Sequence, residues 1–459
     1  MGSISKSFSL ILVLILAVSS LTAIFATIPF GLAQSGTNIS GIISSNTTWT
    51  QANSPYMLTG TVTVNSGVTL TIQAGVTVNL QLNDLQVNGT LKAQGSNSNN
   101  VVFVAAQSDV RPYEGSITSY SSKCIIENAI INSTYVWSYN SIITTNDTMD
   151  GATIQIMGGP ARISDNILVN TELVCSYAIS NGLSVITNNT IGGGIDAFGG
   201  SVVISNNDMT DTAGGGGNFA ISLGTATVII SDNIISGFGI YGSGGTYTIE
   251  RNIIENDYIA IQMFAASPII EENTIINNSI GLNSISSNIP SIPIVTDNNI
   301  YNNSMDNIYL GALSNSNPNI LPAYLSTANS INAVHNWWGT TNIQAINQSM
   351  RDSKNDSLVG TVTFIPFLNA PNSQAFPNLK APVPTLTASP IVSNTLIVTI
   401  IVVVIVVAVV FLMFRKRLKT KPSIPPSTPQ NSTSLLQSFL ILFQVHSRFT
   451  KCGGEISPC

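Results

Sequence analysis

The sequence predicts an all-β fold, a right-handed parallel β-helix, and three observations support this. An aliphatic residue, two mostly polar residues, Asn, any residue and a second aliphatic residue recur as a pattern between residues 125 and 300. Successive Asn residues of the pattern lie 18 to 26 residues apart, which suits one coil of a β-solenoid and is too short for helical repeats. Isoleucine and valine fill the aliphatic positions, and no long 3.6-residue periodicity runs through them.

The repeated Asn predicts a ladder of stacked amides. A residue that turns the chain between two strands must tolerate a bent backbone, and an amide can both donate to and accept from its neighbours one coil away. We therefore expect a ladder at Asn128, Asn166, Asn189, Asn207, Asn233, Asn252, Asn273 and Asn298, with a degenerate copy at Asn146.

Short alternating strands are expected at both ends of the solenoid. Residues 61–64, 68–72, 76–80 and 85–87 alternate apolar and polar side chains between tight turns, and they are predicted to begin the stack. A solenoid must also close its open end. Residues 331–370 are the predicted C-terminal cap: His335 as a packed cap residue, Trp337 and Trp338 as a plug, then an amphipathic helix with Ile343, Ile346 and Met350.

Two long apolar stretches suggest export and anchoring. Residues 1–33 read as a signal peptide, and residues 395–414 form an uncharged stretch followed at once by Arg415, Lys416 and Arg417, as in a transmembrane helix. Residues 34–370 would then be an extracytoplasmic β-helix domain, 371–394 a Pro-rich stalk, and 415–459 a short cytoplasmic tail without regular structure. We expect a single-pass protein of the cell membrane.

The charge of the predicted exterior restricts the partners. Residues 34–394 hold 8 Lys and Arg against 21 Asp and Glu, a net charge of −13. Such a surface argues against nucleic acid, which needs clustered Lys and Arg. The exterior has one histidine, His335, and no Cys-x-x-Cys, so catalytic triads and His- or Cys-based metal sites are not expected. No cofactor is predicted, with calcium as a possible exception.

The chain resembles a known family in three places. The opening turns GTVTVNSGVTLTIQAGVTVNL, the repeated Ile-x-x-Asn-x-Ile coils and the ending HNWWGT followed by GTVTFIPFL are similar to secreted or surface β-helix repeat proteins of archaea and bacteria. These form the pectin-lyase-like superfamily, which includes NosD-like proteins. The resemblance covers roughly residues 38–370 and implies the fold; the superfamily includes lyases, glycoside hydrolases, adhesins and copper-accessory proteins.

An acidic column follows from the register of the repeat. The residue before each Asn should stack once per coil, which brings together Asp165, Asn188, Asn206, Asp232, Arg251, Glu272 and Asp297, with Glu250 and Glu271 beside them. Glu250, Arg251, Glu271, Glu272 and Asp297 are the candidate catalytic set, and the carboxylates among them could bind Ca²⁺. The alternative, which we favour, is structural: Arg251 between Asp232 and Glu272 relieves like-charge stacking.

One strand is unusually aromatic. In residues 134–140, alternation places Tyr135, Trp137 and Tyr139 on one face and Val136 on the other. If Val136 points inward, the three rings form an exposed platform on which sugars could stack. The alternative is an aromatic strand covered by a neighbouring loop. Tyr241, Tyr247, Tyr258 and Phe264 could extend either arrangement.

Three functions are consistent with these features. The first is a non-catalytic, anchored surface protein that binds glycans or components of the envelope or matrix, or that serves as a structural rod. The second is a polysaccharide lyase or glycoside hydrolase that uses the acidic column. The third, a NosD-like copper-accessory role, has no exterior Met/His or Cys cluster in its favour.

Overall fold

The computed structural model describes residues 36–106, 115–121, 123–176, 182–210, 219–286, 289–312 and 330–378. The predicted signal peptide, transmembrane helix and tail lie outside these ranges. Within the described ranges, no helix has the length and apolar character needed to cross a membrane.

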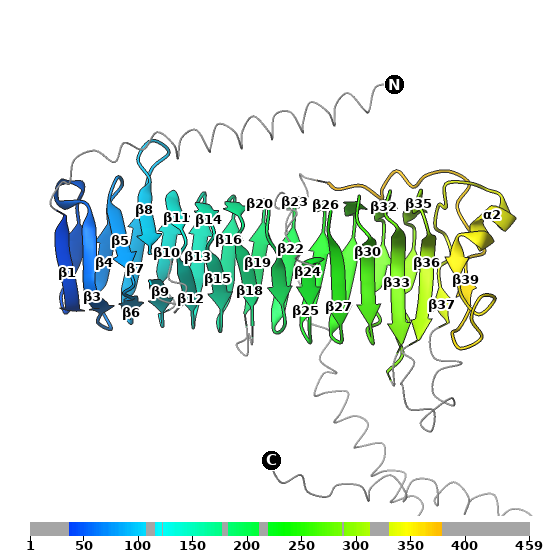
Figure 1. Ribbon diagram of the computed structural model, residues 1–459, viewed down its shortest axis with the longest axis horizontal. Helices are drawn as coiled ribbons and strands as arrows, with labels where there is room; N and C mark the ends of the chain where they lie inside the picture. Colours follow the sequence, from blue (N-terminus) through cyan, green and yellow to red (C-terminus); the bar gives the residue numbers. More distant parts are fainter. Residues whose placement is uncertain are drawn as a thin grey trace, which may run out of the picture. The chain divides into compact units, whose positions relative to one another are not determined.

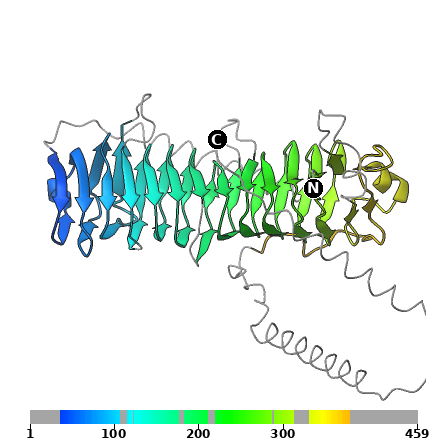
Figure 2. The same cartoon turned by 90° about the horizontal axis from the view of Figure 1, so that it is seen from below.

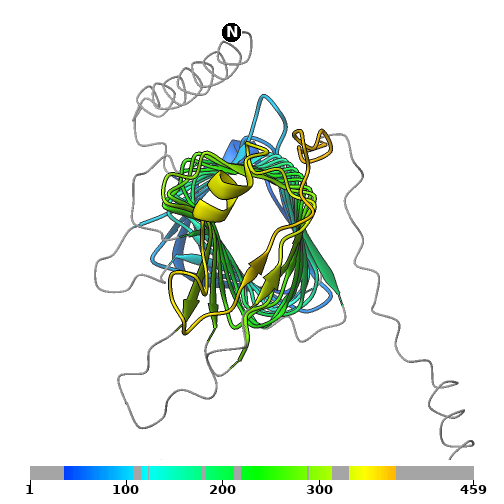
Figure 3. The ribbon, with the colours of Figure 1, turned by 90° about the vertical axis from the view of Figure 1, so that its right-hand side faces the viewer.

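The described residues form a parallel β-solenoid, which confirms the predicted all-β architecture. Every pairing between named strands is parallel, and successive coils follow one another in chain order (Figures 1 and 2). Viewed along the stack, the strands surround a closed interior (Figure 3). The strands form one 14-stranded and one 25-stranded sheet.

The 14-stranded sheet contributes one strand to each coil and is called the first row. Its strands are β2 (Thr47–Trp49), β4 (Thr69–Ile72), β7 (Thr90–Gln94), β10 (Cys124–Glu127), β13 (Ile142–Thr145), β16 (Ala161–Ser164), β19 (Leu183–Thr187), β22 (Ser201–Ser205), β25 (Thr227–Ser231), β28 (Thr246–Glu250), β31 (Ile269–Glu271), β34 (Ile294–Thr296), β37 (Ile331–Asn332) and β39 (Val362–Thr363).

The 25-stranded sheet contains two further rows. It starts with β1 (Thr37–Ile43) and the long β3 (Tyr56–Val64), which pairs with members of both rows. The second row is β5 (Thr77–Gln81), β8 (Val101–Ala105), β11 (Ala129–Asn132), β14 (Thr148–Asp150), β17 (Ile167–Val169), β20 (Thr190–Ile191), β23 (Asp208–Thr210), β26 (Ile234–Ser236), β29 (Ile253–Glu255), β32 (Thr274–Ile276) and β35 (Asn299–Tyr301). The third row is β6 (Leu85–Val87), β9 (Ser116–Ser119), β12 (Tyr135–Ser138), β15 (Thr153–Ile156), β18 (Glu172–Cys175), β21 (Ile195–Ala197), β24 (Phe219–Leu223), β27 (Gly239–Ser243), β30 (Ile259–Phe264), β33 (Ile280–Ser286), β36 (Asp306–Ala312) and β38 (Met350–Arg351).

The two aliphatic positions of the repeat both point inward. The first position stacks through the first row, as in the successive partners Ile204, Ile230 and Ile249, all fully buried. The second stacks through the second row, as in Ile235 and Ile254. Each such side chain contributes about 1.5–3 kcal/mol when fully buried. The aliphatic ladders therefore supply the core that specifies the coil.

The C-terminal end is closed largely as the sequence predicts. The helix α2 (Ile343–Gln348) lies across the end of the stack (Figure 3), with Ile346 buried and Asn342 capping its first turn. Trp338 is buried in the core, whereas Trp337 is only half-buried, so one tryptophan rather than two forms the plug. His335 is exposed and was wrongly expected to pack within the cap.

Residues 371–378 run back along the solenoid instead of leaving it as a stalk. Together with 369 and 370 they form the return segment, drawn in orange along the second-row side in Figure 1. The backbone N–H of Asn372 donates to the Asn299 side chain, and the Asn299 side chain donates to the carbonyl of Asn372. The Thr274 hydroxyl donates to the carbonyl of Ala375. This contact could not be predicted from the sequence, because Pro-rich composition indicates stiffness and not direction. The rest of the predicted stalk, 379–394, lies outside the described residues.

Candidate functional site

The bend between the first and second rows is called the ladder corner. Its first residue has a positive φ in coil after coil: 60° at Asp165, 59° at Asp232, 52° at Arg251 and 54° at Glu272. Its second residue is the repeat Asn. Left-handed backbone is uncommon outside Gly, Asn and Asp, so other residues there require a surrounding structure that holds them.

The Asn side chains provide that support through a continuous ladder. The Asn252 side chain donates to the carbonyls of Ile230 and Glu250 and to Oδ1 of Asn273, each at 2.9 Å, while its own Oδ1 accepts from the Asn233 amide. The same links join Asn166, Asn189, Asn207, Asn233, Asn252, Asn273 and Asn298, and they continue to Asn336. Buried amides that are fully hydrogen-bonded in this way fix a single backbone geometry.

The first predicted rung is wrong by one residue. Asn128 and the degenerate copy Asn146 have positive φ, so they occupy the position before the ladder. The ladder position itself is taken by Ala129 and Asp147, and the Asp147 carboxylate accepts the Ala129 amide at 2.7 Å. In this coil Ile126 and Ile131 point inward, one residue later than Ile125 and Ile130 of the matched pattern.

A second, shorter Asn ladder escaped sequence reasoning. At the bend between the second and third rows, Asn278 donates to the carbonyls of Ile254 and Ile276 and to Asn303. The preceding residues, Asn277 and Asn302, again have positive φ. The repeated Asn-Asn-Ser at 277–279 and 302–304 is the signal that could have revealed it.

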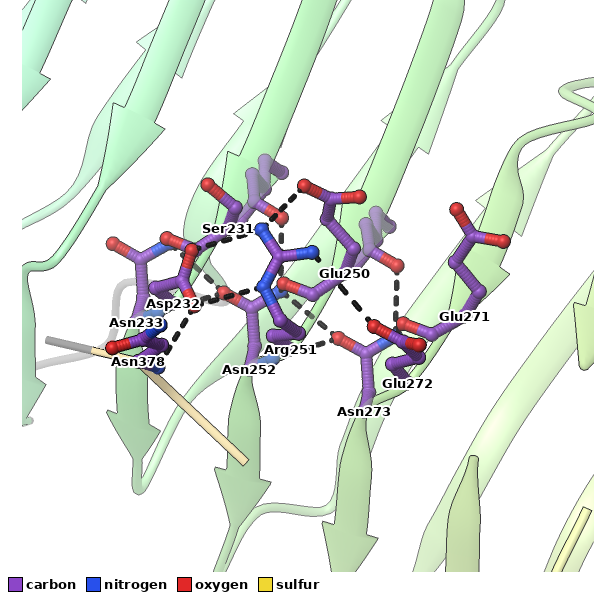
Figure 4. A network of polar contacts seen from close by, with 12 residues as sticks. Ser231, Asp232, Asn233, Glu250, Arg251, Asn252, Glu271, Glu272, Asn273 and Asn378 are labelled. Atoms are coloured by element: carbon purple, nitrogen blue, oxygen red, sulfur yellow. Dashed lines mark hydrogen bonds and ion pairs between the residues drawn. The ribbon is translucent and has the colours of Figure 1, made fainter. Parts of the chain in front are cut away.

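The acidic column is an ion-paired cluster centred on Arg251 (Figure 4). Its guanidinium contacts both carboxylate oxygens of Asp232 at 3.0 Å and Glu250 at 2.7 Å, and it lies 3.8 Å from Glu272. Burial lowers the pKa of Arg251, but the hydrogen bonds to Asp232 and Glu250 outweigh burial and raise it, so the group is always charged. A permanent cation among three carboxylates reduces their mutual repulsion, although one positive charge does not cancel three negative ones.

Glu271 and Asp297 lie at the edge of this cluster. Glu271 pairs with Glu250 in the strand register, and partial burial, then repulsion from Glu250, Glu272 and Asp297, raises its pKa. The Asp297 side chain accepts from Thr296, and its carbonyl accepts from Asn372 of the return segment. The return segment reaches the cluster again where the Asn378 amide donates to Asp232 at 2.8 Å (Figure 4).

The candidate set is thus brought together, but as a partly covered structure in which Arg251 is paired with three of the carboxylates. Asp232 is 1% exposed and bound on one side by Arg251 and on the other by the return segment. In the described part of the chain, no group of three or more His, Cys, Asp or Glu side chains is arranged to hold a metal ion. Cys124 and Cys175 are free buried thiols, and burial raises the pKa of each to about 12.

The aromatic strand β12 has the alternation expected from the sequence. Val136 points into the core, and the rings of Tyr135 and Trp137 stack outside it with centroids 6.5 Å apart. Tyr139 lies past the end of the strand and stacks instead on Tyr120 of the preceding coil, at 4.9 Å. Tyr120 and Tyr139 are 49% and 45% exposed, so their ring faces reach solvent.

A second aromatic group lies farther along the same row. Phe219 of β24 and Tyr241 of β27 stack with centroids 5.1 Å apart, and Phe198, just after β21, is 46% exposed. We call the outer surface of β12, β15, β18, β21, β24 and β27 the aromatic face. Tyr241 was a correct extension, whereas Tyr247 is buried in the core and Tyr258 lies at another corner. Phe198 and Phe219 were missed because each stands alone in its strand.

Two carboxyl groups lie between the aromatic groups. Glu172 of β18 and Asp196 of β21 are within hydrogen-bonding reach of each other, and Ser222 also hydrogen-bonds Asp196. Partial burial, with the neighbouring Asp196 carboxyl, raises the pKa of Glu172, and partial burial also raises the pKa of Asp196. Sequence reasoning did not select this pair, because its members lie 24 residues apart in unremarkable strands.

The comparisons with known proteins add no relative to this geometry. No protein-family model matches the chain, and a search of curated proteins finds no match.

Proposed function

We propose that the protein is a surface β-helix protein that binds glycans through its aromatic face. The observation that carries the proposal is the set of stacked, outward-facing rings on β12 and its neighbours. Flat, partly exposed rings match the apolar faces of sugar rings, and they lie on a sheet that fixes their spacing.

The spacing favours an extended ligand. Neighbouring strands of a sheet are ~4.8 Å apart, so the aromatic groups on β12 and β27 are separated by five strand steps, or ~24 Å. A linear polysaccharide lying along the solenoid axis could contact both groups, whereas a monosaccharide could contact only one. We further propose that residues 1–33 export the protein and that residues 395–414 anchor it, so that the solenoid lies outside the membrane. We also propose that the solenoid is right-handed and of the pectin-lyase-like kind.

We propose a structural role for the acidic column. A lyase or hydrolase would need carboxylates that are free to act on a substrate, and Asp232, Glu250 and Glu272 surround Arg251. We therefore place the ligand on the aromatic face and not on the column.

Binding of the purified full-length chain to an array of polysaccharides tests the proposal. We expect retention by at least one class of linear glycan, and we expect Trp137→Ala and Tyr139→Ala each to weaken it about tenfold or more, as loss of a stacked aromatic contact does. Tyr258→Ala is the matched control, because Tyr258 is 62% exposed outside the aromatic face. No binding to any glycan, or equal losses in all three variants, contradicts the proposal.

A further inference from the structure

The Glu172–Asp196 pair is the chemical feature of the aromatic face that glycan stacking alone does not explain. Glu172 lies two strand steps from Tyr135, and Asp196 two steps from Tyr241, so aromatic groups flank the pair at ~10 Å on either side. A glycan spanning both aromatic groups would therefore pass directly over the two carboxyl groups.

No cation of the surrounding strands compensates these carboxyl groups. The strands of the aromatic face contain no Lys or Arg. Among ion pairs of the described residues, none involves Glu172 or Asp196. Two close carboxyl groups repel each other when both are ionised. Partial burial raises the pKa of both groups, and the neighbouring Asp196 raises that of Glu172 further, while hydrogen bonds to Ser222 and Glu172 oppose the rise at Asp196.

The ladder corner shows how the same chain treats carboxylates whose role is structural. There Arg251 lies among Asp232, Glu250 and Glu272 and forms an ion pair with each of them. Among the described residues the carboxyl groups of the aromatic face have no such partner, although the two sites are similarly placed on the outside of the coil. A cation supplied by a ligand would complete the arrangement in the way that Arg251 completes the column.

Resting on the proposed glycan-binding function, we propose that the aromatic face binds a polysaccharide with protonated amino groups, such as a glucosamine polymer. Its sugar rings stack on Tyr135, Trp137 and Tyr241, and an ammonium group hydrogen-bonds to Glu172 and Asp196. Polyuronates, whose carboxylates would meet this pair, are excluded by like-charge repulsion.

Calorimetric titration of the full-length chain with three hexasaccharides tests the proposal: a glucosamine hexamer, its N-acetylated counterpart and a galacturonate hexamer. At about pH 6, where primary amines keep their proton, we expect the glucosamine hexamer to bind at least about tenfold more tightly than the other two. The double variant Glu172→Gln, Asp196→Asn should lose about tenfold in affinity for that hexamer alone, since both substitutions keep the shape of the side chain. Glu127→Gln, on the first row, is the matched control and should change nothing.

The outcomes separate this inference from the proposed function. Equal affinity for the N-acetylated hexamer, with the double variant unaffected, overturns the amino-glycan inference and leaves glycan binding in place. A preference for galacturonate, with or without added Ca²⁺, also overturns the inference. If Glu127→Gln loses as much affinity as the double variant, the loss reflects the net charge of the protein and not the Glu172–Asp196 pair. This result overturns the amino-glycan inference as well. If none of the three hexasaccharides binds, and Trp137→Ala weakens the binding of no other glycan, then both the proposed glycan binding and the amino-glycan inference are wrong.

Discussion

The ladder corner and the aromatic face occupy different bends and strands of the same coil, and they treat polar groups in opposite ways. At the ladder corner, buried amides are saturated with hydrogen bonds and the carboxylates are held by Arg251 or by the return segment. On the aromatic face, rings and two carboxyl groups face outward, and no ion pair in the described part of the chain involves these carboxyl groups. If the aromatic face binds a glycan as proposed, the repetitive backbone separates stability and recognition into different columns of side chains.

The largest loss of stability is expected from the centre of the ladder. Asn252→Ala removes five hydrogen bonds and leaves the Asn233 amide buried without its acceptor. We expect the free energy of unfolding to fall by about 3 kcal/mol, measured by urea denaturation followed by circular dichroism. Asn347→Ala, at an exposed position of α2, is the control and should cost almost nothing. A loss below about 1 kcal/mol for Asn252→Ala would mean that the ladder does not stabilise the corner.

Removal of the central cation should cost less. Arg251→Asn keeps a residue that tolerates positive φ but leaves Asp232, 1% exposed, without its main partner. We expect a loss of about 2 kcal/mol in the same unfolding measurement. Most of it should return in the double variant with Asp232→Asn, because the stranded charge is then gone. If the double variant is less stable than Arg251→Asn, the charge balance assigned to the column is incorrect.

A smaller and pH-dependent effect is expected at Asp147, the one carboxylate within the ladder. Burial raises its pKa well above the ordinary value, and Glu127 adds to this, while hydrogen bonds from Ala129 and Thr145 oppose it. The folded state therefore holds the proton more tightly than the unfolded state. The contribution of Asp147 to stability is therefore largest at acidic pH and is lost as the pH rises from the unfolded toward the folded pKa of this group.

Asp147→Asn should remove this decline. We expect the variant to gain about 1 kcal/mol or more at pH 7 and little at pH 3, where the native carboxyl is already neutral. Comparing urea midpoints of both proteins across that range isolates Asp147 from every other titrating group. A pH-independent difference between the two proteins would show that Asp147 does not titrate between these limits.

The smallest effect on folding is expected on the aromatic face. Tyr139→Ala removes a ring that is 45% exposed and stacks on Tyr120 at the surface. The free energy of unfolding should therefore fall by less than about 1 kcal/mol. Tyr247→Ala, which removes a ring buried in the core, should cost several times more. A comparable cost at both positions, seen in thermal unfolding, would make the aromatic face a structural element and erase the contrast with the ladder corner.

Periodic features were predictable from the sequence, whereas contacts between distant or irregular segments were not. The inward Ile ladders and the inward Val136 follow from alternation, so the solenoid and the orientation of β12 could be predicted. The Asn128 rung failed because two neighbouring polar positions at the corner both accept Asn, and the coil at 124–132 places its apolar residues one position later. The return segment and the Glu172–Asp196 pair depend on which coils lie side by side, and the variable lengths of the loops hide that from the linear pattern.

The return segment also determines how the solenoid would respond to tension on the chain beyond residue 378. A pull transmitted from that side reaches Asn378, Ala375 and Asn372 first, and these residues are fixed to coils well inside the stack, not to its last coil. The load is therefore spread over several coils as shear across parallel contacts before any of it can peel α2 and β39 from the end. The force therefore acts on the side of the solenoid, and the terminal coil does not have to bear it alone.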